Sequence, residues 1–237
     1  MFPLLQITMG GEDQMAQGLE NADQPIEKTL TVMDLILSGG PGGMIIMGVL
    51  FLLSILAVYI FIERFGAIRK ANQFDDNFIN SIKDDVANGK VDAALSLCKR
   101  TDHPIARMME KGVTRIGKPL TDIAASIENQ GKIEIQRMEK NLPFLATISG
   151  GAPMIGFLGT VIGMILAFKE MAAAGGQVNV GMLAEGIYTA MTTTVAGLAV
   201  GILAYFGYNY IVARIEAVIY KMEVSATEFL DLLHEPV

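Results

Sequence analysis

The stretches APMIGFLGTVIGMILAF (residues 152–168) and GIYTAMTTTVAGLAVGILAYFGYN (residues 186–209) decide the fold of this chain. They lie inside two segments, residues 141–168 and 186–213, and each segment runs for 28 residues without Asp, Glu, Lys, Arg or His. A helix rises about 1.5 Å per residue, so either segment is longer than the roughly 30 Å hydrocarbon core of a bilayer. Both segments therefore predict membrane-spanning helices.

A third apolar run, Met44–Ile62, lies in another charge-free window, residues 35–62, and is rich in Leu, Ile and Val. The chain has 237 residues, 51% of them hydrophobic, and its mean hydropathy is +0.43. This hydropathy is high for a water-soluble protein and fits a helical membrane protein with a sizeable polar part. We therefore predict an all-α membrane protein with three transmembrane helices, at residues 41–63, 142–169 and 186–213.

The rest of the chain is polar, and its periodicity predicts further helices outside the membrane. Gly and Pro divide residues 64–141 into several amphipathic helices, the last of which is expected to continue into the second span. The other polar segments are a poorly ordered acidic tail (1–25), an amphipathic helix on the membrane surface (26–40), an extracytoplasmic loop (170–185) and a charged C-terminal helix (214–237).

The distribution of basic residues predicts the orientation in the membrane. Cytoplasmic flanks of membrane spans carry the excess of Lys and Arg. We therefore expect the N-terminus outside the cytoplasm and both the 64–141 domain and the C-terminus inside it. The eight basic residues on the cytoplasmic side are Arg64, Arg69, Lys70, Lys132, Arg137, Lys140, Arg214 and Lys221, against Lys28 and Lys169 on the other side.

Small residues mark the second and third spans, which contain two GxxxG pairs. In lipid, glycine lets two helix backbones approach closely. We therefore predict that these two spans form the helix contacts of a homo-oligomeric ring, with one proline as a helix-entry or kink residue. The residues assigned to helix packing are Pro153, Gly156, Gly159, Gly163, Gly197 and Gly201.

These same motifs carry a resemblance to a known family. The run PMIGFLGTVIGMILAF (residues 153–168) resembles the second membrane helix of the ExbB/TolQ family, with MotA a more distant relative. The run that contains TTVAGL (residues 193–198) resembles the family's third membrane helix. The resemblance covers about residues 31–233. It includes SILAVYIFIER (54–64), which resembles the end of the family's first membrane helix, and the segments GKVDAALSLCKR (89–100) and HPIARMMEKGVTRIG (103–117), which resemble its cytoplasmic domain.

The resemblance implies an assembly and an activity. It implies a pentamer of this chain around the membrane helices of an ExbD/TolR-like dimer, whose single span carries an Asp. It implies that ion flow drives force transmission through a TonB/TolA-like protein from the bacterial inner membrane. The sequence itself adds that the three apolar windows hold no titratable side chain apart from Tyr, so this chain is expected to form only part of an ion path.

The resemblance also assigns pore-lining residues. Thr160 matches the Thr of the family's GTVxGM motif, and Thr194 matches its second pore threonine. Thr189 stands where the family often has a Glu, five residues before Thr194, and Glu185 lies one turn earlier on the same face as Thr189 and Thr193. The residues assigned to the ion pathway are thus Thr160, Thr194, Thr189, Thr193 and Glu185. From the residues alone, a hydrogen bond of Thr160 to the carbonyl four residues earlier in its own helix is favoured over a pore role. A solvated helix start accounts for Glu185 as well as a pore role does.

The sequence speaks against several other classes of function. A net charge of −7 argues against a nucleic-acid partner. Cys98 is the only cysteine, which excludes an intrachain disulfide and predicts a small buried hydrophobe, and His103 is expected at a surface turn. We see no nucleophile–base constellation and no metal-ligand spacing, so we expect no enzyme activity, no cofactor and no metal site.

The predicted function is that of an ExbB-like motor subunit, which uses the proton motive force for TonB-dependent transport across the outer membrane. A TolQ-type motor for envelope maintenance is an alternative within the same family. A stand-alone channel and a structural scaffold are alternatives of a different class. The absence of intramembrane charge argues against the stand-alone channel.

Overall fold

The computed structural model describes residues 40–72, 76–173 and 180–234, and every element in these ranges is a helix. The predicted tail (1–25) and all but the last residue of the predicted surface helix (26–40) lie outside these ranges. The helices are α3 (Gly40–Asn72), α4 (Asp76–Ala87), α5 (Val91–Arg100), α6 (Pro104–Val113), α7 (Leu120–Glu139), α8 (Leu142–Ala173) and α9 (Val180–His234).

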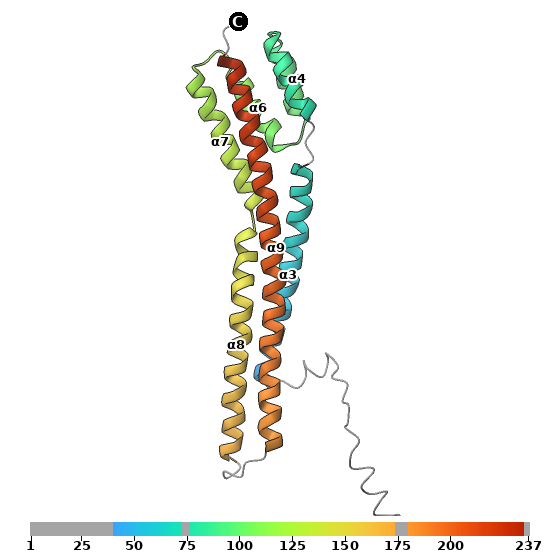
Figure 1. Ribbon diagram of the computed structural model, residues 1–237, viewed down its shortest axis with the longest axis vertical. Coiled ribbons are helices and arrows are strands. Elements are labelled where there is room, and N and C mark those ends of the chain that lie inside the picture. Colours follow the sequence, from blue (N-terminus) through green and yellow to red (C-terminus); the bar gives the residue numbers. More distant parts are fainter. Residues whose placement is uncertain (1–39, 73–75, 174–179, 235–237) are drawn as a thin grey trace, which may run out of the picture.

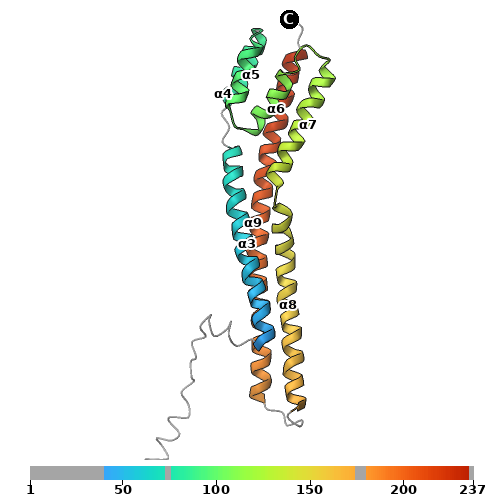
Figure 2. The same cartoon turned by 180° about the vertical axis from the view of Figure 1, so that it is seen from behind.

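The molecule is elongated, with three long helices side by side (Figure 1). Helices α3, α8 and α9 each contain a stretch long and apolar enough to cross a membrane, which confirms an all-helical protein with three candidate spans. Helices α4 to α7 gather around the C-terminal half of α9, beyond one end of the three-helix part (Figures 1 and 2). The most extensive helix contact is the one between α8 and α9.

Helix α9 runs for 55 residues without a break. The sequence predicted a third span and a separate C-terminal helix, but no Gly or Pro occurs between Gly207 and His234, so nothing ends the helix after the span. From Ile211, at the end of the span, its buried residues recur at alternating steps of four and three, which keeps one face towards α3, α4, α6 and α7. These residues are Ile211, Ile215, Val218, Met222, Ser225 and Phe229.

Helices α7 and α8 are two separate helices, contrary to the predicted continuation of one into the other. Asn141 has a left-handed backbone with φ of 65°, a conformation that Asn tolerates better than most residues. Pro143 follows at the second position of α8, where its missing N–H could not have bonded back to α7. The chain therefore turns between α7 and α8, and the second candidate span begins as a new helix.

Helix α3 is tied to this turn by hydrogen bonds of Glu63 and Arg64, at the end of the first predicted span. Arg64 is buried and donates from one guanidinium nitrogen to the carbonyl of Arg137, in the last turn of α7, at 3.1 Å. A cation there satisfies a free carbonyl and complements the helix dipole. Glu63 pairs with Arg64 and accepts from the Asn141 amide at 3.3 Å. The first span, α7 and α8 are thus joined at one level.

A buried carboxylate organises the helices outside the spans. Glu134 on α7 is 1% exposed and accepts two hydrogen bonds from the Arg107 guanidinium, of 2.9 and 2.7 Å. Gln130 and Arg137 donate to the same carboxylate at 2.8 and 2.7 Å. Such bidentate pairing fixes the relative orientation of two helices more tightly than apolar contact does, here α6 against α7.

Two expectations about single residues have opposite outcomes. Cys98 is buried at 1% exposure, as predicted, and burial raises the pKa of its thiol to about 12. The sequence predicted His103 at a surface turn, and this prediction is wrong. The residue is buried at the start of α6. Its Nδ1 accepts from the N–H of Ile105 at 3.2 Å and its Nε2 lies 2.9 Å from the carbonyl oxygen of Ala71. The imidazole therefore caps α6 and joins it to the end of α3.

Candidate functional site

The contact between α8 and α9 brings together most of the residues that the sequence analysis assigned to helix packing. A Cβ added at Gly156 would lie 2.7 Å from the Thr193 carbonyl oxygen and 3.1 Å from the Cα of Gly197. A Cβ added at Gly197 would lie 2.6 Å from the Ala152 carbonyl oxygen. These neighbours are backbone atoms that cannot move aside, so both positions require glycine for the two helices to approach this closely.

The remaining assigned residues extend this contact along the spans. Opposite Gly159 lies the Thr193 side chain, and a Cβ at Gly163 would lie 2.7 Å from that of Ala190. Gly201 lies against Pro153, whose ring would be 2.6 Å from an added Cβ. The close approach therefore lies within one chain, whereas the sequence analysis attributed these glycines to contacts between copies.

Threonine hydroxyls of α9 bond across this contact to a carbonyl of α8. Thr193 is 3% exposed, and its Oγ1 lies 3.1 Å from the Gly156 carbonyl oxygen and 2.8 Å from the carbonyl oxygen of Ala190 on its own helix. The Thr194 Oγ1 donates to the same Gly156 carbonyl at 3.1 Å. One acceptor on α8 thus serves two neighbouring hydroxyls, which fixes the register of the two spans.

Thr160 lies beside this contact rather than in it. Its side chain is half-buried, and its Oγ1 donates to the Phe157 carbonyl oxygen of its own helix at 2.6 Å. A hydroxyl that donates to its own backbone keeps two lone pairs that can accept a hydrogen bond. At the edge of the α8–α9 contact, Thr160 and the half-buried Thr194 can therefore each accept a hydrogen bond from a group that carries a proton.

The other two predicted site residues lie near the start of α9. Glu185 and Thr189 are helical, and the structure describes their backbone but not their side chains. Helix α8 continues to Ala173 and α9 begins at Val180, so helix extends into the segment 170–185 for which the sequence predicted a loop. Glu185 thus stands on a helix that has already begun.

Two features of this site were not predicted from the sequence. The Gly156 carbonyl acts as a shared acceptor, and its only signal was a pair of adjacent threonines, Thr193 and Thr194, opposite a glycine-rich helix. Ala190 and Ala167 complete the contact, the latter against Gly186. Alanine is too common in membrane helices for the pattern to have singled these residues out.

Comparison with known proteins identifies the class to which this arrangement belongs. Residues 100–224, more than half of the chain, match the MotA/TolQ/ExbB proton channel family. The chain belongs to this family, whose members are membrane channel or motor subunits and not enzymes. The family and the three apolar helices make the chain a multi-pass protein of the bacterial inner membrane.

Individual relatives agree with this assignment. A biopolymer transport protein ExbB homolog of Methanothermobacter thermautotrophicus is 29% identical over 198 residues, which is 82% of this chain and 67% of that protein. The Tol-Pal system protein TolQ of Pseudomonas aeruginosa is 36% identical over 104 residues, 44% of this chain and 45% of TolQ. ExbB-like protein 2 of Helicobacter pylori is 35% identical over 106 residues, 45% of this chain and 64% of that protein.

Proposed function

We propose that this chain is the ring-forming subunit of an ion-driven motor, which couples the proton motive force to force transmission for TonB-dependent transport across the outer membrane. One observation carries the proposal: the charge-free windows 35–62, 141–168 and 186–213 contain no Asp, Glu, His, Lys or Arg. A proton relay through a bilayer normally needs such a group. A channel built on these spans therefore takes its titratable group from a partner.

The proposed partner is an ExbD/TolR-like dimer whose single membrane helix carries one Asp. A carboxylic acid on that helix would donate its one hydrogen bond to a free lone pair of Thr160 or of Thr194 when protonated, and would lose this bond when ionised. One charge that crosses about 100 mV supplies roughly 2.3 kcal/mol. This energy is comparable to that of a few hydrogen bonds, so a contact made of single hydrogen bonds can be broken and remade as the helices rotate or slide. We propose five copies of this chain around the dimer, with the N-terminus extracytoplasmic and the C-terminus cytoplasmic.

The system that the motor drives has two candidates. The similarity to ExbB homologues supports transport through a TonB-like protein. The similarity to TolQ of the Tol-Pal system supports an envelope-maintenance motor that acts through a TolA-like protein. Both candidates share the ring, the partner dimer and the ion path.

Co-purification tests the proposed assembly. The chain is expressed with the single-span protein encoded beside it, and the complex is weighed by native mass spectrometry after mild detergent extraction. We expect a mass of five copies of this chain and two of the partner. A stable complex that lacks any second protein would support a stand-alone channel or a scaffold and overturn the proposal.

A pair of substitutions tests the ion path. Thr160→Val keeps the side-chain shape and removes the acceptor in the middle of α8, where water cannot replace it, so gradient-driven transport should fall strongly. Glu185→Gln changes a residue at the mouth of the span, where water can substitute, and should cost less. Thr147→Val is the matched control, because its hydroxyl bonds the Pro143 carbonyl of the same helix near the basic end.

Transport is measured as growth under the condition that requires the motor, with membrane levels of each variant checked. Normal growth of the Thr160→Val strain, together with loss of growth in Glu185→Gln, would place the control of ion flow at the mouth of the span. That result would contradict the assignment of the inner hydroxyl. It would leave the partner complex intact in the co-purification.

A further inference from the structure

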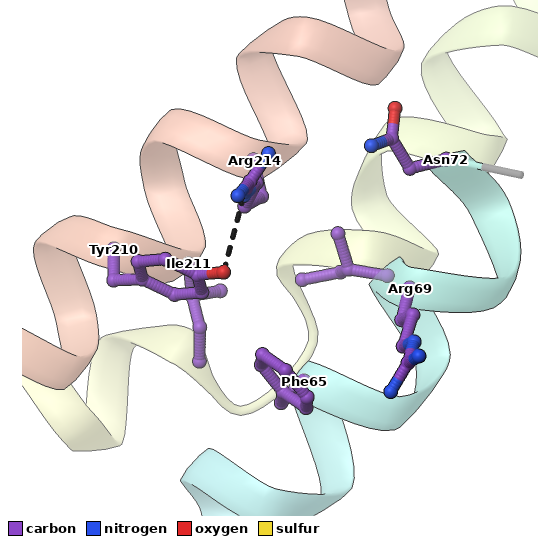
Figure 3. Close-up of a pocket in the computed structure, with 7 residues that line it drawn as sticks. Phe65, Arg69, Asn72, Tyr210, Ile211 and Arg214 are labelled. Atoms are coloured by element: carbon purple, nitrogen blue, oxygen red, sulfur yellow. Dashed lines mark hydrogen bonds between the residues drawn. The ribbon is translucent and has the colours of Figure 1, made fainter.

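A cavity lies between α3 and α9 at the basic end of the spans. It has a volume of about 220 Å³. Figure 3 shows Phe65, Arg69 and Asn72 of α3 on one side of this cavity and Tyr210, Ile211 and Arg214 of α9 on the other. None of the residues that line it is acidic. The cavity therefore combines two guanidinium groups, an amide and a phenol at one site.

The two arginines of this cavity are available to an anion. Among the residues that the structure describes, no carboxylate lies within ion-pair distance of Arg69 or Arg214. Arg214 is held by a neutral group: its Nε donates to the Tyr210 hydroxyl at 3.2 Å, and its guanidinium carbon lies 5.2 Å from the centroid of that ring. Guanidinium groups that are held in place but unpaired bind phosphate well.

The depth of the cavity matches the lipid headgroups. Arg214 is the first charged residue after the apolar window 186–213, and Arg69 follows the last apolar residue of the first window, Ile62, by seven residues, or about 10 Å of helix. The headgroup layer adds roughly 5–7 Å on each side of the hydrocarbon core. Both arginines thus stand at or just beyond this layer, within reach of a headgroup phosphate.

An apolar groove continues from the cavity along the spans. Its volume is about 500 Å³, and it is lined by α3, α8 and α9 residues that include Phe61, Leu145, Leu203 and Gly207. Tyr210 lines both the cavity and the groove, and the stacked rings of Phe61, Phe65 and Tyr210 lie at their junction. A basic cavity followed by an apolar groove has the polarity of a phospholipid, which free phosphate cannot match.

We propose that this site binds an anionic phospholipid, with its phosphate between Arg69 and Arg214 and one acyl chain in the groove. Basic pockets between membrane helices are known to hold anionic headgroups. The site lies apart from the α8–α9 threonines, so the inference is independent of the proposed ion path. A bound lipid would fill the space between the first and third spans at the level where Arg64 ties α3 to the α7–α8 turn.

Lipid retention tests the proposal on the intact complex. The protein is extracted in mild detergent, and bound phosphatidylglycerol and phosphatidylcholine are counted by native mass spectrometry after exchange with an equal mixture of the two. Each basic residue near a membrane surface contributes about 1 kcal/mol, so Arg69→Gln and Arg214→Gln should each lower the preference for phosphatidylglycerol about fivefold. Arg100→Gln, an exposed arginine on α5, is the matched control and should leave the preference unchanged.

A second measurement keeps the arginines in place. The chain has no Trp, so Phe65→Trp introduces a single tryptophan, whose fluorescence can be excited selectively, at the junction of cavity and groove. In nanodiscs, brominated phosphatidylglycerol should quench this fluorophore more strongly than brominated phosphatidylcholine at the same mole fraction. An excess of inorganic phosphate should displace little of the brominated phosphatidylglycerol, because it lacks the acyl chain that the groove holds. Full displacement would show that the arginines hold phosphate alone and would overturn the proposal.

Three other results would also overturn the proposal. Equal quenching by the two brominated lipids would show that only the surrounding lipid reaches the groove. Unchanged phosphatidylglycerol retention in the double arginine variant, with normal assembly on a sizing column, would show that the arginines bind nothing. A cross-link between Phe65→Cys and a neighbouring copy, in place of lipid retention, would show that a second chain covers the site.

Discussion

At the scale of single residues, the hydrogen bonds to the Gly156 carbonyl fix the register of α8 against α9. Thr193→Val and Thr194→Val each remove one of the carbonyl's two hydroxyl donors across the helix contact. Side-chain hydrogen bonds between membrane helices average about 0.6 kcal/mol, so each single change should cost about this much. The remaining hydroxyl still serves the carbonyl in each single variant, so the double variant should cost more than the sum. The measurement is unfolding in mixed micelles as a double-mutant cycle.

Thr192→Val is the control for this cycle. Its hydroxyl bonds only the Tyr188 carbonyl of its own helix, at 3.0 Å, among the hydrogen bonds of the described residues. The change should therefore be close to neutral. A loss of stability in Thr192→Val equal to that in Thr193→Val would show that the cost reflects the helix backbone of α9 and not the contact with α8.

His103 gives the stability of the helical domain a dependence on pH. Burial is the main cause that lowers the pKa of this imidazole, which is neutral while it caps α6. In the unfolded chain the imidazole has its ordinary pKa of 6.5. As the pH falls, the unfolded chain therefore binds this proton at a higher pH than the folded protein does. This contribution to stability is therefore complete above pH 6.5 and is lost as the pH falls from there towards the folded-state pKa.

His103→Asn should remove this dependence, because the Asn side chain can still accept from the Ile105 N–H but does not titrate in this range. We expect the melting temperature of the wild type to fall between pH 7.5 and 5, and that of the variant to be lower but flatter. The neighbouring Asp102 does not titrate between pH 7.5 and 5, because the hydrogen bond from Lys70 lowers the pKa of its carboxyl from the ordinary value of 3.8. Parallel melting curves would contradict the role of His103.

At the scale of elements, the contact of α8 with α9 depends on missing side chains. Gly156→Ala places a methyl group 2.7 Å from the carbonyl oxygen of Thr193, which must force the helices apart. Overpacking of this kind costs about 1–3 kcal/mol. The measurement is resistance to unfolding by sodium dodecyl sulfate, read from the helical circular dichroism signal.

Gly150→Ala is the matched control on the same helix. A Cβ at Gly150 meets no atom within 4 Å, so the added methyl group is expected to be neutral or to stabilise α8 slightly. Equal losses in the two variants would indicate that α8 is sensitive to any methyl group. In that case the approach of α9 at Gly156 would not be the cause.

The sequence predicted the membrane-spanning helices better than the points where helices begin and end. Charge-free length is a property of each segment alone, and it located all three candidate spans. The turn at Asn141 depends on a backbone conformation that a periodic pattern does not register, and the pattern ran through it. The 55-residue helix α9 shows the reverse error, because a change from apolar to charged composition was interpreted as the end of a helix.

At the scale of the whole molecule, the threonines were found from motifs but their surroundings were not. A GxxxG pair permits close approach to any helix, and only the folded chain shows that α9 is the partner of α8. The predicted ring and its lumen would lie between chains, so which side of Thr160 would face a partner depends on the assembly and not on one chain. The continuous helix α9 nevertheless links the spans directly to α4–α7 (Figure 2).

The orientation of the whole molecule remains a prediction, based on eight basic residues at one end of the spans against two at the other. Cys98 cannot report it: the thiol is 1% exposed and burial raises its pKa to about 12, so it should stay unlabelled even after lysis. New cysteines at exposed positions are therefore needed, in a Cys98→Ala background. Lys111 on α6 and Ala172 on α8 lie at opposite ends of the molecule.

An impermeant maleimide added to intact cells should label Ala172→Cys and leave Lys111→Cys unlabelled, because the helical domain is expected in the cytoplasm. Both variants should react after lysis, which controls for accessibility of each site. The Cys98→Ala chain without a new cysteine is the blank. Labelling of Lys111→Cys in intact cells, with Ala172→Cys protected until lysis, would place α4–α7 outside. The basic end of the spans, with Arg69 and Arg214, would then face the outer leaflet and not the cytoplasmic one.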